Sequence, residues 1–123
     1  MTDETKQYRK LVERLYKKTR DKEISWSTGW TGELECELSS YKVRLESSEG
    51  PEGSPLEDVI IINSNDEIID SFNDEDISDD SNPLGFPNYW RLMQQLRKLA
   101  NRQAKGVDTA LKAILDNLED EDF

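Results

Sequence analysis

The feature that most constrains the fold is a change in the phase of hydrophobic alternation across the two serines at residues 39–40. Apolar residues occupy the even positions of residues 34–38 and the odd positions of residues 41–45. A two-residue turn at the serines would gather the apolar side chains on one face and set Glu35 opposite Arg44 on the other. Because one register satisfies both faces, the segment predicts an antiparallel hairpin with one buried face. The predicted cross-strand pairs are Leu34–Leu45, Glu35–Arg44, Cys36–Val43, Glu37–Lys42 and Leu38–Tyr41.

Two longer segments carry apolar residues at helical spacing. In residues 3–21 and again in residues 88–105, apolar side chains recur every three or four positions, which predicts amphipathic helices. Gly106 ends the second helix, and Asp108 can cap a short final one. We expect the final helix to turn its large apolar residues inward, namely Leu111, Ile114, Leu115 and Leu118.

Shorter apolar stretches at residues 24–28, 59–62 and 68–72 predict further strands. The Gly-, Pro- and Ser-rich residues 47–57 predict a mobile connection. The acidic residues 73–82 predict a mobile link, because their composition offers little to bury.

The order of these elements predicts an α+β fold. We expect an antiparallel meander of about five strands, with an N-terminal helix and two C-terminal helices packed on one face. Residues 1–118 would form a single domain that contains the acidic link, and residues 119–123 would form a disordered acidic tail.

Charge is unevenly distributed along the chain. The formal net charge of −11 comes from 16 Lys and Arg residues against 27 Asp and Glu residues. Residues 1–22 carry +4 and residues 88–106 carry +5, whereas residues 23–87 carry −15 and residues 107–123 carry −5. A net charge this negative argues against bulk binding to nucleic acid or anionic membranes and favours basic protein partners.

The residue types present exclude several kinds of catalytic site. The chain has no histidine, and its one cysteine, Cys36, alternates inward among apolar residues. Triads and dyads that use histidine, and intramolecular disulfides, are therefore excluded. No phosphate-binding loop or nucleophile elbow is present, so we expect no enzymatic activity, no cofactor and no metal.

The acidic link fits only the start of a calcium-binding EF-hand loop. With Asp74 as the first ligand, the twelfth position falls on Gly85, where an EF-hand loop needs glutamate. The calcium interpretation therefore fails, and a solvated run of charge fits the composition better.

Two tryptophans stand apart from the predicted core. Trp30 lies between two glycines at a loop tip, and Trp90 lies off the apolar stripe of its helix. Each either folds against a neighbouring element or anchors a partner. Together with the acidic residues, they give the candidate partner-binding set: Trp30, Glu33, Asp74, Glu75, Asp76, Asp79, Asp80 and Trp90.

These observations predict a non-catalytic interaction domain that binds a basic protein through an acidic surface, as an immunity protein, inhibitor or adaptor would. In class, the small acidic chain resembles bacterial toxin-neutralising immunity proteins and inhibitors that mimic nucleic-acid charge, although no motif identifies a family. Two alternatives stay open. One is a nucleic-acid module that uses the basic helix faces. The other is a small structural homo-oligomer, such as a homodimer, formed through Trp90 or the outer face of residues 59–62.

The same sequence features predict a cytoplasmic location. The N-terminal residues lack the apolar run of a secretory signal, and the longest apolar run, at residues 59–62, is too short to cross a bilayer. A single cysteine suits a reducing compartment.

Overall fold

Five antiparallel strands form one sheet, and they neighbour one another in chain order. The computed structural model describes residues 3–29, 31–78 and 82–119. The strands are β1 (Ser27–Thr28), β2 (Leu34–Leu38), β3 (Tyr41–Glu49), β4 (Pro55–Ile62) and β5 (Ile68–Asn73). The helices are α1 (Asp3–Arg20), α2 (Tyr89–Ala104) and α3 (Val107–Glu119), and a short 3-10 turn spans Pro51–Gly53. The predicted α+β class and the strand meander are confirmed.

The register of the β2–β3 hairpin is the predicted one at all five pairs. Ser39 and Ser40 both adopt positive φ angles, 52° and 72°, as a two-residue hairpin turn of this hand requires. Arg44 lies 2.9 Å from a carboxylate oxygen of Glu35. Lys42 lies opposite Glu37 as predicted, but its ammonium pairs with Asp66 at 3.1 Å.

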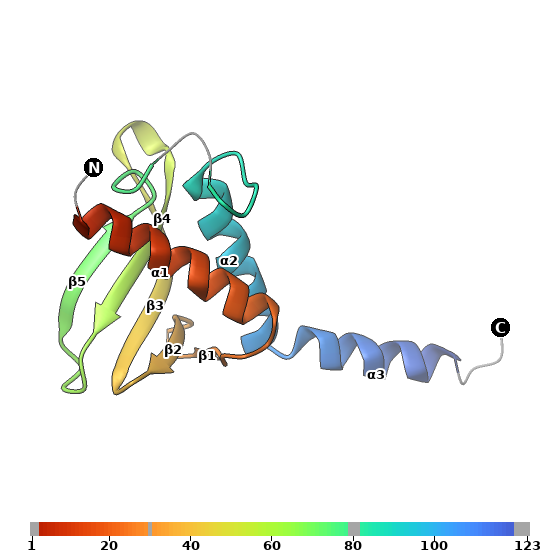
Figure 1. Ribbon diagram of the computed structural model, residues 1–123. Coiled ribbons are helices and arrows are strands. Elements are labelled where there is room, and N and C mark those ends of the chain that lie inside the picture. The colour runs from red at the N-terminus through yellow and green to blue at the C-terminus, as the bar shows by residue number, and fades with distance from the viewer. Residues whose placement is uncertain (1–2, 30, 79–81, 120–123) are drawn as a thin grey trace.

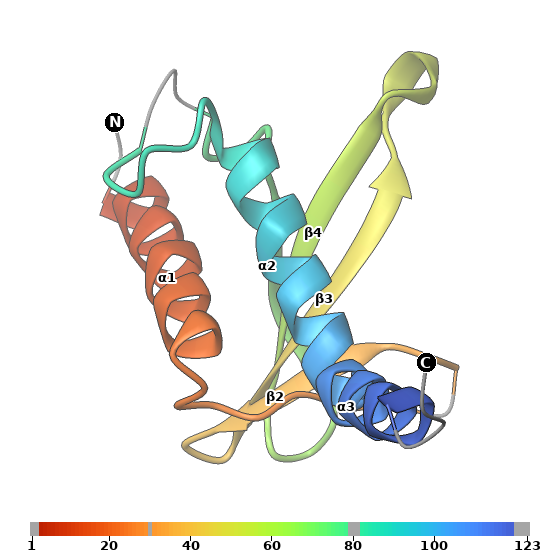
Figure 2. The same ribbon diagram turned by 90° about the vertical axis from the view of Figure 1, so that its right-hand side faces the viewer.

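The core lies between the sheet and a layer formed by α1 and α2, which pack against each other on one side of it (Figures 1 and 2). Val12 from α1, Val59 from β4 and Leu96 from α2 are fully buried there. The Tyr8 ring stacks on Phe72 with centroids 4.1 Å apart, which ties α1 to β5. Cys36 is buried in the same core, and burial raises the pKa of its thiol.

The predicted strand at residues 24–28 is shorter than expected. Only Ser27–Thr28 pair with β2, because the backbone just before them bonds to α2 instead. The Gln103 side chain donates to the Ile24 carbonyl at 2.9 Å and accepts from the Trp26 amide at 2.6 Å.

The prediction that residues 47–57 form a mobile connection is wrong. β3 continues to Glu49 and β4 begins at Pro55, and the two strands pair along their whole length. Figure 2 shows this hairpin rising beside α2 and beyond it. Gly50, Pro51 and Gly53 lie in the tight turn at its tip, and Pro55 is the first residue of β4. Glu52 and Gly53 adopt positive φ angles in this turn.

The described part of the predicted acidic link, residues 73–78, forms a hydrogen-bonded turn. The Asn73 amide donates to the Asp76 carboxylate, and the Asp76 amide donates to the Asn73 side chain. Ile77 is fully buried and anchors this turn in the core. Composition missed the turn because one apolar residue and local side-chain bonds are enough to fix it.

The last helix does not turn its apolar face inward, so that prediction is wrong. α3 extends away from the sheet and from α1 and α2 (Figure 1), and none of its 13 residues is buried. Its large apolar side chains are between 46% and 55% exposed. α1 and α2 already cover the sheet face, so the core leaves no place for a third helix.

Candidate interaction surfaces

The most unusual surface is the apolar stripe of α3, formed by Val107, Leu111, Ile114, Leu115 and Leu118. Their spacing of three and four residues puts them on one face of the helix. Four of these side chains are about half exposed. An apolar stripe of this kind normally faces a core, yet here it has no cover among the described residues.

The direction of α3 is set at its root. Two residues, Lys105 and Gly106, separate it from α2, and Gly106 has a φ of 64°, which favours glycine. Arg102 forms an ion pair with Asp108 across this junction. The Ala110 amide donates to the Gly106 carbonyl at 3.0 Å, so the helix begins directly after the bend.

Acidic residues accompany the stripe. Asp108, Asp116 and Glu119 lie on α3 with one cation, Lys112, and the sequence adds three more acids at residues 120–122. Residues 107–123 therefore carry −5, which makes this segment an acidic amphipathic helix followed by acidic sequence.

The solvent side of the helical layer has the opposite charge. Lys6, Lys10, Arg14 and Lys17 share one exposed face of α1, and within the described residues no ion pair neutralises them. α2 has no acidic residue. Its exposed cations are Arg91, Lys98 and Arg102, and Lys105 follows directly after the helix.

A groove of about 230 Å³ lies where the C-terminal ends of α1 and α2 meet the root of α3. Arg20, Lys22 and Arg102 bring positive charge to it, and Leu99 gives it an apolar patch. Arg20 pairs with Asp21 and Arg102 with Asp108, so Lys22 is the lining cation that has no ion pair among the described residues. Asp108 is the one acid among its lining residues in the described part of the chain. The groove is thus basic and partly apolar.

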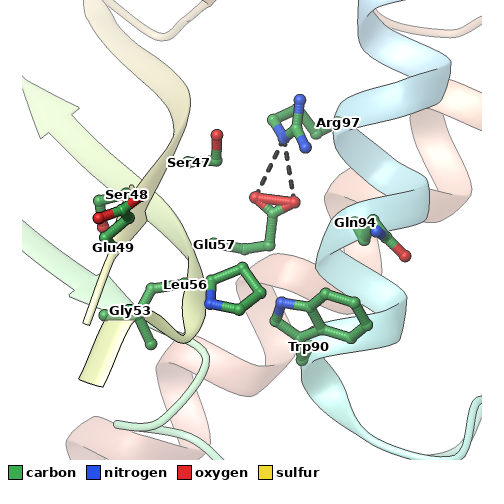
Figure 3. Close-up of a pocket in the computed structure, with 10 residues that line it drawn as sticks. Ser47, Ser48, Glu49, Gly53, Leu56, Glu57, Trp90, Gln94 and Arg97 are labelled. Carbon is green, nitrogen blue, oxygen red and sulfur yellow. Dashed lines mark hydrogen bonds and ion pairs between the residues drawn. The ribbon is translucent and has the colours of Figure 1, made fainter. Parts of the chain in front are cut away.

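A second hollow, of about 330 Å³, lies between α2 and the β3–β4 hairpin (Figure 3). Arg97 reaches across it to Glu57, with its Nε 3.0 Å from both carboxylate oxygens. Burial raises the pKa of Glu57, and the Arg97 guanidinium opposes that rise. The buried Trp90 Nε1 has no hydrogen-bond partner among the described residues, while Arg91 lies 5.2 Å from the Trp90 ring.

The sequence-predicted binding residues do not form one surface. Trp90 lines the hollow beside the hairpin, Glu33 bonds to Thr31 in its own loop, and Asp74 is only 8% exposed. Glu75 and Asp76 are exposed beside Asp74. Trp30, Asp79 and Asp80 lie outside the described residues.

Asp74 contradicts the prediction of a fully solvated acidic run. Its carboxylate accepts the Glu57 amide at 2.8 Å, so it holds the turn after β5 against β4. Burial raises the pKa of Asp74, whereas the hydrogen bonds that its carboxylate accepts from backbone N–H groups lower it.

Sequence reasoning missed α3 as a surface. Its stripe looks like that of a core helix, because amphipathicity does not show what covers the apolar face. The two-residue connection to α2 and the −5 charge of residues 107–123 were the available signals that it differs from the other helices.

The described residues contain no cluster of three or more acidic or thiol side chains placed to hold a metal ion. Nor does any helix in the described ranges combine the length and apolar composition needed to span a membrane. Comparisons with protein-family models, with curated proteins and with solved structures find no match to this chain.

Proposed function

We propose that this chain is a non-catalytic protein-interaction domain that binds a basic protein partner, with α3 as its contact helix. The observation that carries the proposal is the half-exposed stripe of Leu111, Ile114, Leu115 and Leu118 on a helix that extends from the body. Covering each of these side chains with a partner would contribute ~1 kcal/mol, since each still has about half of its surface to bury. Helices with such faces commonly bind in apolar grooves of other proteins.

The charge beside the stripe supports a basic partner. Asp108 and Glu119 flank the stripe, Asp116 lies on the opposite side of α3, and the molecule as a whole carries −11. Carboxylates at the edge of an apolar contact mainly raise the association rate and select against acidic partners. The partner surface that fits is an apolar groove with lysine or arginine at its rim.

The proposal includes a cytoplasmic location. Its support is the single Cys36, which is free and buried in the core, as suits a reducing compartment.

The test is a capture experiment with matched variants of the full chain. Leu111→Gln/Leu115→Gln removes apolar surface and keeps good helix formers. Ala113→Gln/Asn117→Gln makes two substitutions at the same spacing, about 200° around the helix from the leucines. We expect a basic, stoichiometric protein to be retained at low salt by the wild type and by the Ala113/Asn117 variant. The Leu111/Leu115 variant should lose it.

A partner that remains bound to the Leu111/Leu115 variant would show that α3 is not the contact helix. Far-UV circular dichroism of both variants checks that α3 remains helical.

One observation favours a second candidate function, a module that binds polyanions. The exposed cations Lys6, Lys10, Arg14 and Lys17 on α1 match the repeated charge of a phosphate or sulfate polymer. The total charge of −11 opposes such binding, so the α1 face would have to act locally.

A further inference from the structure

The α3 stripe and the groove between α1 and α2 are complementary in chemistry, yet they do not meet within one molecule. The two-residue link and the Arg102–Asp108 ion pair direct α3 away from its own helical layer (Figure 1). The groove lies directly at the root of α3, since Gly106, Asp108 and Thr109 are among its lining residues. The acidic helix and the basic groove are therefore adjacent, but α3 points the wrong way to occupy its own groove.

The charges on the two surfaces decide which arrangement of two copies is favourable. Pairing α3 with α3 of another copy would bring two segments of −5 together, and like charges at an interface oppose binding. Placing α3 on the helical layer of another copy instead sets it beside Arg20, Lys22 and the exposed cations of α2. The second arrangement covers the same apolar stripe and has favourable electrostatics.

α3 is shorter than α2, the helix that it would lie along. α3 has 13 residues and α2 has 16, so at 1.5 Å per residue they are ~20 Å and ~24 Å long. Leu99 in the groove offers apolar contact to the stripe.

We propose that α3 of one copy docks on the basic groove between α1 and α2 of a second copy, which returns the same contact. Because the groove lies at the root of α3, a two-fold axis near Gly106 allows both contacts at once. The proposal rests on the proposed function in one respect, since it assigns a partner to the same face of α3. A dimer of this kind occupies α3 and so competes with a basic protein partner for the same face.

The experiment measures the oligomeric state of the purified full chain by sedimentation equilibrium, from about 5 µM to about 500 µM. Salt is varied from about 50 mM to about 500 mM, which shortens the screening length several-fold. We expect a dimer whose dissociation constant rises at least tenfold at the higher salt. Leu111→Gln/Leu115→Gln should raise it at least tenfold, and Ala113→Gln/Asn117→Gln should leave it within about twofold.

The groove is tested by charge reversal with a matched control on the same helix. Arg20→Glu/Lys22→Glu reverses two charges in the groove, and Lys6→Glu/Lys10→Glu reverses two on the opposite end of α1. We expect only the first pair to weaken the dimer by tenfold or more. Thermal unfolding of each variant checks that the fold is kept.

Mixing two defective variants identifies the contact. The Leu111/Leu115 variant has an intact groove, and the Arg20/Lys22 variant has an intact stripe, so their mixture can form one of the two contacts. We expect the mixture to associate more tightly than either variant alone. Pairing of α3 with α3 would give no such rescue, because one stripe would still be defective.

Three results would overturn the proposal: a monomer at every concentration, a dimer that tolerates the Leu111/Leu115 change, or a dimer that depends on the stripe but tolerates Arg20→Glu/Lys22→Glu. The proposed function is tested separately. A monomeric chain that captures a basic protein through the stripe refutes self-docking and keeps the function, whereas a dimer without such capture does the reverse.

Discussion

At the scale of single residues, the ion pair between Glu57 and Arg97 is the contact whose loss should cost most. Glu57 has a side chain only 5% exposed, and Arg97 supplies its cation from α2. Arg97→Met leaves a buried carboxylate without a partner, which should lower the free energy of unfolding by about 3 kcal/mol. Urea denaturation at neutral pH measures this loss.

The control for that prediction is the double variant Glu57→Gln/Arg97→Met. It removes both charges, so it should recover most of the lost stability. A loss below about 1 kcal/mol for Arg97→Met alone would mean that Glu57 does not depend on this cation.

Asp74 gives a pH-dependent prediction. Burial raises its pKa above the ordinary value of 3.8, so the folded chain holds this proton more tightly than the unfolded chain does. The contribution to stability is therefore fully present below that ordinary value and is lost as the pH rises through the folded pKa. Asp74→Asn keeps an oxygen for the Glu57 amide and removes this loss.

We expect Asp74→Asn to gain stability relative to the wild type as the pH rises from about 3 to 7. Urea denaturation at each pH gives the difference, and Glu75→Gln, an exposed neighbour, is the control. If the difference in stability between Asp74→Asn and the wild type stays constant over this pH range, the pKa of Asp74 is the same in the folded and unfolded chain. The burial of Asp74 was not predictable from the sequence, because its carboxylate accepts a hydrogen bond from the Glu57 amide, which lies 17 residues away on β4.

At the scale of elements, the β2–β3 turn is specified by its strands more than by its own residues. Ser39 and Ser40 adopt left-handed backbone angles that serine disfavours. Ser39→Asn/Ser40→Gly supplies the preferred turn residues and should raise the free energy of unfolding by about 1–2 kcal/mol. Thermal and urea denaturation measure the gain, and Ser47→Asn/Ser48→Gly within β3 should destabilise. Equal effects at both places would refute a role for the turn angles.

The sequence predicted this hairpin pair by pair because two independent patterns, apolar alternation and opposite charges, required the same register. It predicted the β3–β4 hairpin and α3 badly. Serine, glycine and proline in residues 47–57 obscured strands that pair with each other. For α3, an amphipathic stripe defines a helix face but not its neighbour, and the direction is set by a two-residue link.

The exposed position of α3 leads to a stability prediction. Because none of its residues is buried, ending the chain after Gly106 should change the free energy of unfolding of a dilute, monomeric sample by less than about 1 kcal/mol. The lost ion pair of Arg102 and Asp108 is exposed and adds little. Urea denaturation checks this. A larger loss would mean that α3 supports the core.

At the scale of the whole molecule, the fold sorts charge by face. α1 and α2 carry exposed lysine and arginine, whereas 17 of the acids lie in residues 23–87, which include the whole sheet. Opposite charges also meet inside, at Arg97 and Glu57, so part of the segregation holds the layers together. The sequence predicted the segregation, but only the packing of both helices on one side of the sheet turns it into two faces.

This separation predicts that the chain binds a polyanion despite its net charge of −11. At about 20 mM salt the screening length is ~20 Å, so a nearby sulfate polymer responds mainly to the basic face of α1. We expect the chain to be retained on heparin at that salt. Because only a few cations contact the polymer, the chain should be released well below about 0.5 M salt. Lys10→Glu should abolish retention, whereas Lys112→Glu, the same charge change on α3, should leave it. A wild-type chain that passes through the column at low salt would show that total charge outweighs the α1 face, and the second candidate function would then be rejected.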